Sequence, residues 1–154
     1  MVGRFNLSNL LAAVGIAEAL RLPHAATAVA LASQRPLAGR MEPSEAGQEF
    51  PILVDYAHTE AALAAALRSM RDLSSRRVVV VFGCGGDRDR SKRPLMGAAA
   101  ARLADLAILT SDNPRTENPL AILADVEKGI REVTTDAARY RVEPDRREAI
   151  RMAL

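Results

Sequence analysis

The spacing of hydrophobic residues changes near residue 39 and separates a helical segment from one in which strands and helices alternate. Between residues 10 and 20 the apolar residues recur at the spacing of one helix face, at Leu10, Leu11, Val14, Ala17 and Leu20. Asn6 precedes this run and is expected to cap the helix. A second helix is predicted over Pro23–Ser33, because proline suits the first helical turn. The stretch Arg35–Gly39 then breaks the pattern and predicts a domain boundary.

After residue 39, short apolar runs typical of strands alternate with longer runs typical of helices. The predicted strands are Arg40–Glu45, Pro51–Tyr56, Arg77–Phe82, Leu106–Thr110 and Arg139–Val142. The predicted helices run from Thr59 to about Leu73, from Pro94 to about Leu103, from Pro119 to Arg131 and from Asp145 onward. Four successive valines, Val78–Val81, are typical of a strand covered on both faces. The alternation predicts an α/β fold with a doubly wound, mostly parallel sheet flanked by helices.

Composition and charge narrow the classes of function. The 154 residues are 49% hydrophobic and 26% charged, which fits one globular domain, or one domain and part of another. A net charge of +2 is too small to indicate a nucleic-acid partner. The single cysteine, Cys84, excludes an intrachain disulfide and a multi-cysteine metal site, and it favours a reducing compartment. The longest stretches without a charged residue, Phe5–Ala17 and Leu22–Gln34, are too short to span a bilayer, so we expect a cytoplasmic protein.

Both ends of the sequence look interrupted. The chain begins inside a motif-like segment, Gly3–Asn6, and stops at Leu154 within a helical pattern that carries no stop signal. We therefore expect it to be a piece of a longer protein.

Asp55 and His58 form the first of three polar clusters that follow predicted strands. They lie where a strand passes into a helix, and ligands of open α/β sheets bind outside the carboxyl ends of strands. A carboxylate there can bind sugar hydroxyls, and a histidine beside helix amides can face phosphate. The alternative is that both side chains only satisfy loop and cap groups.

The second cluster is the stretch Gly83–Arg93, which combines three glycines with four cations between a strand and a helix. Glycines let the backbone approach a ligand, and the cations can hold a carboxylate or phosphate. The alternative is a solvated turn with locally paired charges. The stretch is not a Walker A loop, a motif that occurs nowhere in this sequence. Cys84 has no convincing histidine or aspartate partner and is not expected to act as a nucleophile.

The third cluster is the stretch Thr110–Arg115, at the carboxyl end of another strand. Asparagine offers a donor and an acceptor, and arginine offers a fork for a carboxylate. Asp-Asn-Pro is also a good turn sequence, so a structural role stays open. All three clusters are expected at the same edge of one sheet. His24 has no such support and is expected to be an exposed first-turn residue.

Five motifs in one order give the chain a resemblance to a known family. They are the Gly3–Ala13 segment with Asn6 and Asn9, Gly39–Glu42, Asp55–Thr59, Gly83–Arg93 and Asp112–Arg115. Together they resemble the Mur ligases of peptidoglycan synthesis over nearly the whole chain. The resemblance implies an ATP-dependent amide ligase that activates a carboxylate as an acyl phosphate, which an incoming amine attacks. It also implies that residues 1–38 end a central ATPase domain and that residues 39–154 form most of a C-terminal Rossmann-like domain.

The resemblance implies ATP contacts for five residues. Asn6 and Asn9 would lie near the adenine, and Asp55 would bind the ribose hydroxyls. Arg40 and His58 would lie near the phosphates. Mg²⁺ would accompany the ATP, with its ligands outside this chain.

The incoming amino acid would be held by Arg88, Asp112, Asn113 and Arg115, and UDP-MurNAc-L-Ala-D-Glu would be the other substrate. A pocket for lysine should place acidic residues around the side-chain ammonium. The second carboxylate of meso-diaminopimelate instead needs a cation with two parallel donors. Arg115 supplies that fork, and the motif around it resembles the diaminopimelate-adding form, so meso-diaminopimelate is the expected substrate.

Parts of the family pattern lie outside this sequence. The P-loop, the Mg²⁺ ligands and a carbamylated lysine would precede Met1, and a Gly-Lys-Gly-His-Glu segment of the amino-acid pocket would follow Leu154. We therefore expect the chain alone not to catalyse the reaction. Two hypotheses stay open: a fragment of an amide ligase, or a stand-alone α/β module that binds an amino acid or nucleotide. Folylpolyglutamate synthase shares the architecture but is not expected to carry Asp-Asn-Pro-Arg.

Overall fold

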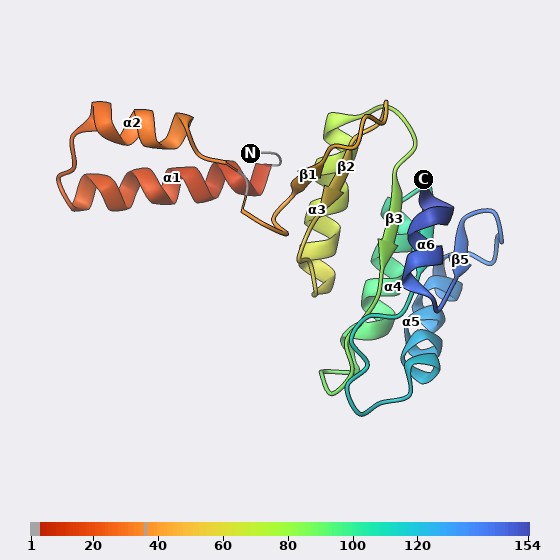
Figure 1. Ribbon diagram of the computed structural model, residues 1–154. Helices are drawn as coiled ribbons and strands as arrows, with labels where there is room; N and C mark the ends of the chain where they lie inside the picture. Colours follow the sequence, from red (N-terminus) through yellow and green to blue (C-terminus); the bar gives the residue numbers. More distant parts are fainter. Residues whose placement is uncertain (1–3, 36) are drawn as a thin grey trace. The chain divides into compact units, whose positions relative to one another are not determined.

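The computed structural model describes residues 4–35 and 37–154 (Figure 1). The chain folds into two compact units that meet in the sequence between Tyr56 and Ala57. The boundary predicted at Arg35–Gly39 falls inside the first unit and stays a prediction about the longer protein. Across the described residues, no helix combines the length and the apolar character that crossing a membrane requires.

The first unit begins with two helices that pack against each other, α1 (Arg4–Ala19) and α2 (His24–Ala32). The turn between them contains Arg21 in the left-handed region, with a φ of 53°. Asn6 lies inside α1, so the prediction that it caps this helix is wrong: the helix already begins at Arg4. The second helix is as predicted, except that Pro23 is its N-cap and not its first residue.

A small antiparallel hairpin completes the first unit. Strand β1 (Glu42–Ser44) pairs with β2 (Ile52–Val54), and Glu42 faces Val54 in the register. Gly47, with a φ of 83°, lies in the connecting turn, where a left-handed backbone favours glycine. Both strands are shorter than predicted, and they form a sheet separate from the parallel one.

The second unit has the alternating strands and helices that the sequence predicts. In chain order its elements are α3 (Glu60–Leu73), β3 (Val79–Phe82), α4 (Lys92–Leu103), β4 (Leu106–Leu109), α5 (Pro119–Val133), β5 (Tyr140–Val142) and α6 (Arg146–Ala153). The three strands are parallel and lie in the order β3-β4-β5. The mixed α/β fold with a mostly parallel sheet is therefore confirmed, with element ends shifted by about two residues.

Side-chain chemistry explains where the helices of this unit begin. The Thr59 hydroxyl accepts a hydrogen bond from the Ala62 N–H and so caps α3, at the residue where the sequence predicted this helix to start. Asp145 caps α6 in the same way by accepting from the N–H groups of Arg147 and Glu148. Pro119 occupies the first turn of α5, where its missing N–H is not needed.

The core lies between the sheet and the helices. Its most buried side chains come from β3, β4, α4 and α5, and they include Phe82, Met96, Leu109, Val126 and Ile130. Figure 1 shows α4 and α5 side by side, and two glycines allow this close packing. A Cβ atom on Gly129 would collide with the Pro94 carbonyl oxygen, and one on Gly97 would collide with that of Val126. The packing holds the first turn of α4, and thus the end of the loop after β3, against α5.

Candidate functional site

The loop after β3 and the loop after β4 meet at the carboxyl ends of adjacent parallel strands. The Gly86 N–H donates to the Asn113 carbonyl oxygen over 2.9 Å, and Arg115 Nη1 donates to the Gly86 carbonyl oxygen over 2.6 Å. A Cβ atom on Gly85 would lie 2.8 Å from Arg115 Nη1, and one on Gly86 would collide with the Pro114 carbonyl oxygen. The glycines therefore serve the approach of the two loops. The sequence had suggested that they admit a ligand to the backbone.

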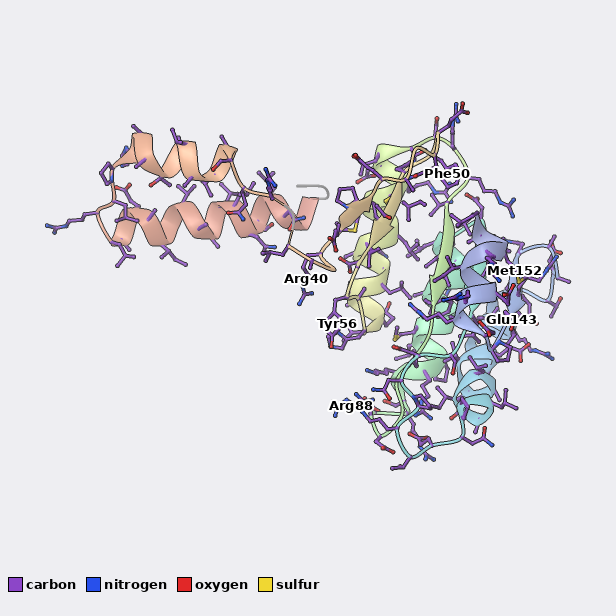
Figure 2. The ribbon with its side chains drawn as sticks, in the orientation of Figure 1. Arg40, Phe50, Tyr56, Arg88, Glu143 and Met152 are labelled. Atoms are coloured by element: carbon purple, nitrogen blue, oxygen red, sulfur yellow. The ribbon has the colours of Figure 1, made fainter. Side chains whose placement is uncertain are left out.

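A second set of bonds joins the same loops at Asp87. Its carboxylate accepts from the Thr116 hydroxyl over 2.7 Å and from the Thr116 N–H over 3.2 Å, while its own N–H donates to Glu117 Oε1 over 2.6 Å. Asp87 and Arg115 both have left-handed backbones, with φ of 52° and 50°, which is rare for residues other than glycine. Arg88 and Arg115 thus flank one bonded crossing between the loops, and Figure 2 shows Arg88 on the loop after β3.

A buried ion-pair network anchors this crossing to the helices. Arg93, in the first turn of α4, has a side chain only 1% exposed, and it donates to both carboxylate oxygens of Glu117, over 2.7 and 3.1 Å. It also donates to Asp125 on α5 over 3.2 Å. Its Nε has no hydrogen-bond partner among the described residues. Burial of a guanidinium is tolerated only where it is paired, and two carboxylates supply that pairing here.

The network lowers the pKa of the Glu117 carboxyl to about 2. The largest cause is the hydrogen bond from Arg93, followed by the Asp87 N–H, and Arg90 contributes its charge from 2.9 Å. The bond from Glu117 in turn raises the pKa of Arg93. Sequence reasoning missed this pair. It treated Arg93 as one of several loop cations, and no local pattern connects residues 93 and 117.

His58 lies close to the N-terminus of α4. The Lys92 ammonium donates to the His58 carbonyl oxygen over 3.0 Å, so it ties the segment before α3 to the end of the loop after β3. The imidazole belongs to an exposed residue. Of the three predicted clusters, the structure thus brings His58 near the glycine-rich loop and joins that loop to Asp112–Arg115.

Asp55 follows β2 in the antiparallel hairpin, so the prediction that all three clusters lie at one edge of one sheet is wrong. The short connection through Gly47 lets β2 pair locally with β1, and the two strands form a sheet of their own. The half-buried Asp55 carboxylate accepts from the Met41 N–H over 2.9 Å. This bond is the loop-satisfying role that the sequence left open.

The other predicted nucleotide residues of the first unit also have local contacts. The Arg40 guanidinium carbon lies 5.3 Å from the centre of the Tyr56 ring, a cation–π distance, and Figure 2 labels both residues. Asn9 Nδ2 donates to Asn6 Oδ1 over 3.3 Å on α1. Asn6 is 8% exposed. Their roles toward a nucleotide stay predictions.

Within the loop after β4, Asn113 Oδ1 accepts from the Arg115 N–H over 3.2 Å, a turn that fixes the backbone between them. Asp112 is exposed beside it. Cys84 is buried, and burial raises the pKa of its thiol to about 11, so at neutral pH the thiol is protonated and a poor nucleophile. Over residues 4–35 and 37–154, no group of three histidine, cysteine or acidic side chains is arranged to hold a metal ion.

Comparison with known proteins gives one family. Residues 39–154 match the family described as "Mur ligase, glutamate ligase domain". The chain is 50% identical over 154 residues to UDP-N-acetylmuramoyl-L-alanyl-D-glutamate–2,6-diaminopimelate ligase of Geobacillus thermodenitrificans. It is 49% identical over 154 residues to the ligase of the same name from Solibacter usitatus. In both cases the match covers all of this chain and 31% of the relative, so the chain spans about a third of the length of these curated relatives.

Solved structures give the same result for the fold. A structure of a UDP-N-acetylmuramoyl-L-alanyl-D-glutamate–2,6-diaminopimelate ligase superposes with a TM-score of 0.69 at 42% identity, covering 99% of this chain and 30% of that one. A folylpolyglutamate synthase of Mycobacterium tuberculosis, in complex with ADP and AMPPCP, superposes with a TM-score of 0.71 over 99% of this chain and 33% of that one. The second pair is 23% identical and supports the fold alone.

Proposed function

Because the chain belongs to the Mur ligase family, as its five motifs predicted, we propose that it is part of a UDP-N-acetylmuramoyl-L-alanyl-D-glutamate–2,6-diaminopimelate ligase. In this proposal the whole enzyme transfers the γ-phosphoryl group of ATP to the D-glutamyl γ-carboxylate, which gives an acyl phosphate and releases ADP. The amine of the incoming amino acid then attacks that carbonyl, an amide forms, and phosphate leaves. Residues 1–38 belong to the central ATPase domain and residues 39–154 to the C-terminal domain.

The observation that carries the proposal is the joined pair of loops after β3 and β4. The crossing at Gly86 and Asp87 fixes Arg88 and the Asn113–Arg115 turn relative to each other. Side chains of this kind, held on two tied loops at the carboxyl ends of a parallel sheet, suit a small molecule with more than one carboxylate. We assign Arg88, Asp112, Asn113 and Arg115 to the incoming amino acid.

The geometry of Arg115 favours meso-diaminopimelate over lysine. Its Nη1 donates to the Gly86 carbonyl oxygen, which holds that side of the guanidinium against the loop after β3. Its Nε and Nη2 have no hydrogen-bond partner in the part of the chain that the structure describes, and that edge can bind a carboxylate with two parallel bonds. An ammonium at the end of a lysine side chain would meet a like charge there.

The nucleotide side of the proposal rests on the motifs. Asn6 and Asn9 are assigned to the adenine, Asp55 to the ribose, and Arg40 and His58 to the phosphates. ATP brings Mg²⁺, which supplies charge neutralisation on the phosphates. Following the family pattern, we place the Mg²⁺ ligands in the rest of the longer polypeptide. A cytoplasmic location belongs to the same proposal.

The test is turnover of the full-length enzyme with two amino acids. Purified enzyme is supplied with ATP, Mg²⁺ and UDP-MurNAc-L-Ala-D-Glu, and amide product is measured with meso-diaminopimelate or lysine. We expect product with meso-diaminopimelate and at least about 100-fold lower kcat/KM with lysine, because an unmatched charged group is left in the pocket. Equal or better use of lysine would overturn the amino-acid assignment, and no amide with either would overturn the ligase.

A further inference from the structure

Glu117 is the point at which the two loops are most densely bonded. It lies two residues after Arg115 on the loop after β4, and its carboxylate is 12% exposed. All of its described partners belong to the other loop or to the first turn of α4. They are the Asp87 N–H at 2.6 Å, Arg90 Nη2 at 2.9 Å, and Arg93 Nη2 and Nη1 at 2.7 and 3.1 Å. One carboxylate therefore accepts three hydrogen bonds and forms an additional ion pair with Arg90, all from the neighbouring segment.

Arg93 connects this point to the rigid part of the unit. Its side chain is 1% exposed, and it reaches Asp125 on α5 as well as Glu117. The helices that carry these residues are packed so closely that Gly129 leaves no room for a Cβ atom against Pro94. Arg93 thus connects the loop crossing to two helices, α4 and α5, that are closely packed against each other.

The residues assigned to the amino acid lie immediately beside these bonds. Asp87 and Arg90, one and two positions from Arg88, both bond to Glu117. Thr116, the neighbour of Arg115, bonds to Asp87. Arg88 itself makes no side-chain bond with the described residues. The bonds at Glu117 therefore fix the backbone positions from which the Arg88 and Arg115 side chains extend, although Glu117 is not among the groups assigned to the substrate.

We propose that Glu117, held by Arg93, is a positioning residue that fixes the distance between Arg88 and Arg115 and thereby sets affinity for the incoming amino acid. The inference rests on the proposed function, because it takes Arg88 and Arg115 as amino-acid contacts. A ligand with charged groups at both ends is bound well only when its two binding groups keep a fixed span, and a displacement of about 1 Å can reduce rates about 100-fold.

The test compares Glu117→Gln with Glu127→Gln in the full-length enzyme. Glu127, on α5, also accepts from an arginine, Arg131, but that arginine is exposed and belongs to the same helix. Both variants lose one carboxylate that pairs with a guanidinium. They differ in that the Glu117 pair lies at the loop crossing and the Glu127 pair lies on the surface of α5. KM is measured for meso-diaminopimelate, ATP and UDP-MurNAc-L-Ala-D-Glu, with melting temperature recorded for each variant.

For Glu117→Gln we expect KM for meso-diaminopimelate to rise about 10-fold or more, with KM for ATP changed less than about twofold. Glu127→Gln should change no KM by more than about twofold. Arg93→Lys should fall between wild type and Glu117→Gln, because an ammonium keeps the charge but cannot bond to both carboxylate oxygens. Thr116→Ala, an exposed substitution that removes one bond of the same crossing, should raise only the amino-acid KM, about threefold.

Wild-type amide formation with meso-diaminopimelate, measured first, tests the proposed function by itself. Given that activity, an unchanged amino-acid KM in Glu117→Gln would overturn the positioning role. A parallel rise of all three KM values, or a fall in kcat that only follows the loss of folded protein, would also overturn it. If Glu117→Gln does not fold, Arg93→Lys decides, because it loses the two-point bond to Glu117, and an unchanged amino-acid KM in that variant would overturn the same role.

Discussion

The Asp55 carboxylate accepts a hydrogen bond from the backbone N–H of Met41, 2.9 Å away, and this bond joins the residue after β2 to the residue before β1. Met41 is 2% exposed and has a left-handed backbone with a φ of 48°. A side chain assigned to ribose therefore also holds the open end of the hairpin. Substitutions at Asp55 must separate these two roles.

In the full-length enzyme, Asp55→Ala should raise KM for ATP about 10-fold or more, because charged hydrogen bonds to hydroxyl groups contribute about 1.5–3 kcal/mol. KM for meso-diaminopimelate should change less. Asp55→Asn is the matched control for the hairpin, since its amide oxygen can still accept from Met41, and it should keep the melting temperature better than Asp55→Ala. If Asp55→Ala loses stability but its KM for ATP does not change, Asp55 has only the structural role and the ribose assignment is wrong.

The 154-residue chain by itself should form no amide from UDP-MurNAc-L-Ala-D-Glu, ATP and meso-diaminopimelate. Its sequence contains no Walker A loop, and it spans about a third of the length of its curated relatives. Phosphate release and amide product are the measurements, with the full-length enzyme as the positive control. Phosphate release that depends on both the UDP-linked substrate and the amino acid would contradict the expectation.

Arg115→Lys should impair the full-length enzyme strongly with meso-diaminopimelate. An ammonium cannot bond to the Gly86 carbonyl and also present two parallel donors to a carboxylate. We expect a loss of about 10- to 100-fold in kcat/KM, the range for one charged hydrogen-bonding pair. Arg131→Lys, an exposed site on α5, is the matched control and should stay near wild type. An Arg115→Lys variant that keeps its activity and its preference over lysine would contradict the assigned role.

Gly129→Ala should destabilise the second unit, because the new Cβ atom would collide with the Pro94 carbonyl of α4. Overpacking of this kind costs about 1–3 kcal/mol, and more where backbone has to move. Gly15→Ala is the control: it is also in a helix, nothing lies within 4 Å of its Cβ position, and alanine should stabilise the helix by about 0.5–1 kcal/mol. Urea unfolding of both variants checks the opposite signs.

The stability of the chain should depend on Glu117 at acid pH. Its pKa is held at about 2 in the folded protein, against a value of 4.5 without the native contacts. A lowered folded-state pKa means that the ionised carboxylate stabilises the fold above about pH 4.5, and that this stabilisation is lost as the pH falls toward 2. The difference in unfolding free energy between wild type and Glu117→Gln should therefore shrink over this range. A constant difference from pH 6 to pH 2 would contradict the low pKa.

Local sequence signals predicted most of the second unit. Thr59 and Asp145 lie at helix starts as expected, and the valine run before Phe82 forms a strand, although Val79–Val81 are only half-buried, because helix starts and strand patterns depend on neighbours in the sequence. The bond between Arg93 and Glu117 could not be predicted in this way. It forms only because β3 and β4 are adjacent and α4 packs on α5, which are relations between distant segments.

The motifs predicted that the loops carrying Arg88 and Arg115 are neighbours. They did not predict the contacts that join these loops. Arg88 and Arg115 were expected on neighbouring loops, and the structure ties those loops together. The cap assigned to Asn6 and the shared sheet edge assigned to Asp55 were wrong. In both cases a local interaction explains the difference. The helix extends upstream of Asn6, and β2 pairs with its neighbour in sequence, β1.

The close approach of Gly86 to Pro114 has a consequence for redesign of amino-acid preference. The backbones of the two loops are in close contact with each other. A segment from a related enzyme placed at residues 83–91 will therefore fit only if residues 110–118 have a matching backbone shape. Chimeras that exchange only one of these segments should misfold locally where the two loops meet. Chimeras that exchange both segments should keep the contacts between the loops. Under the proposed function, amino-acid preference is therefore a property of the two segments together, and a change in the backbone of either one requires a matching change in the other.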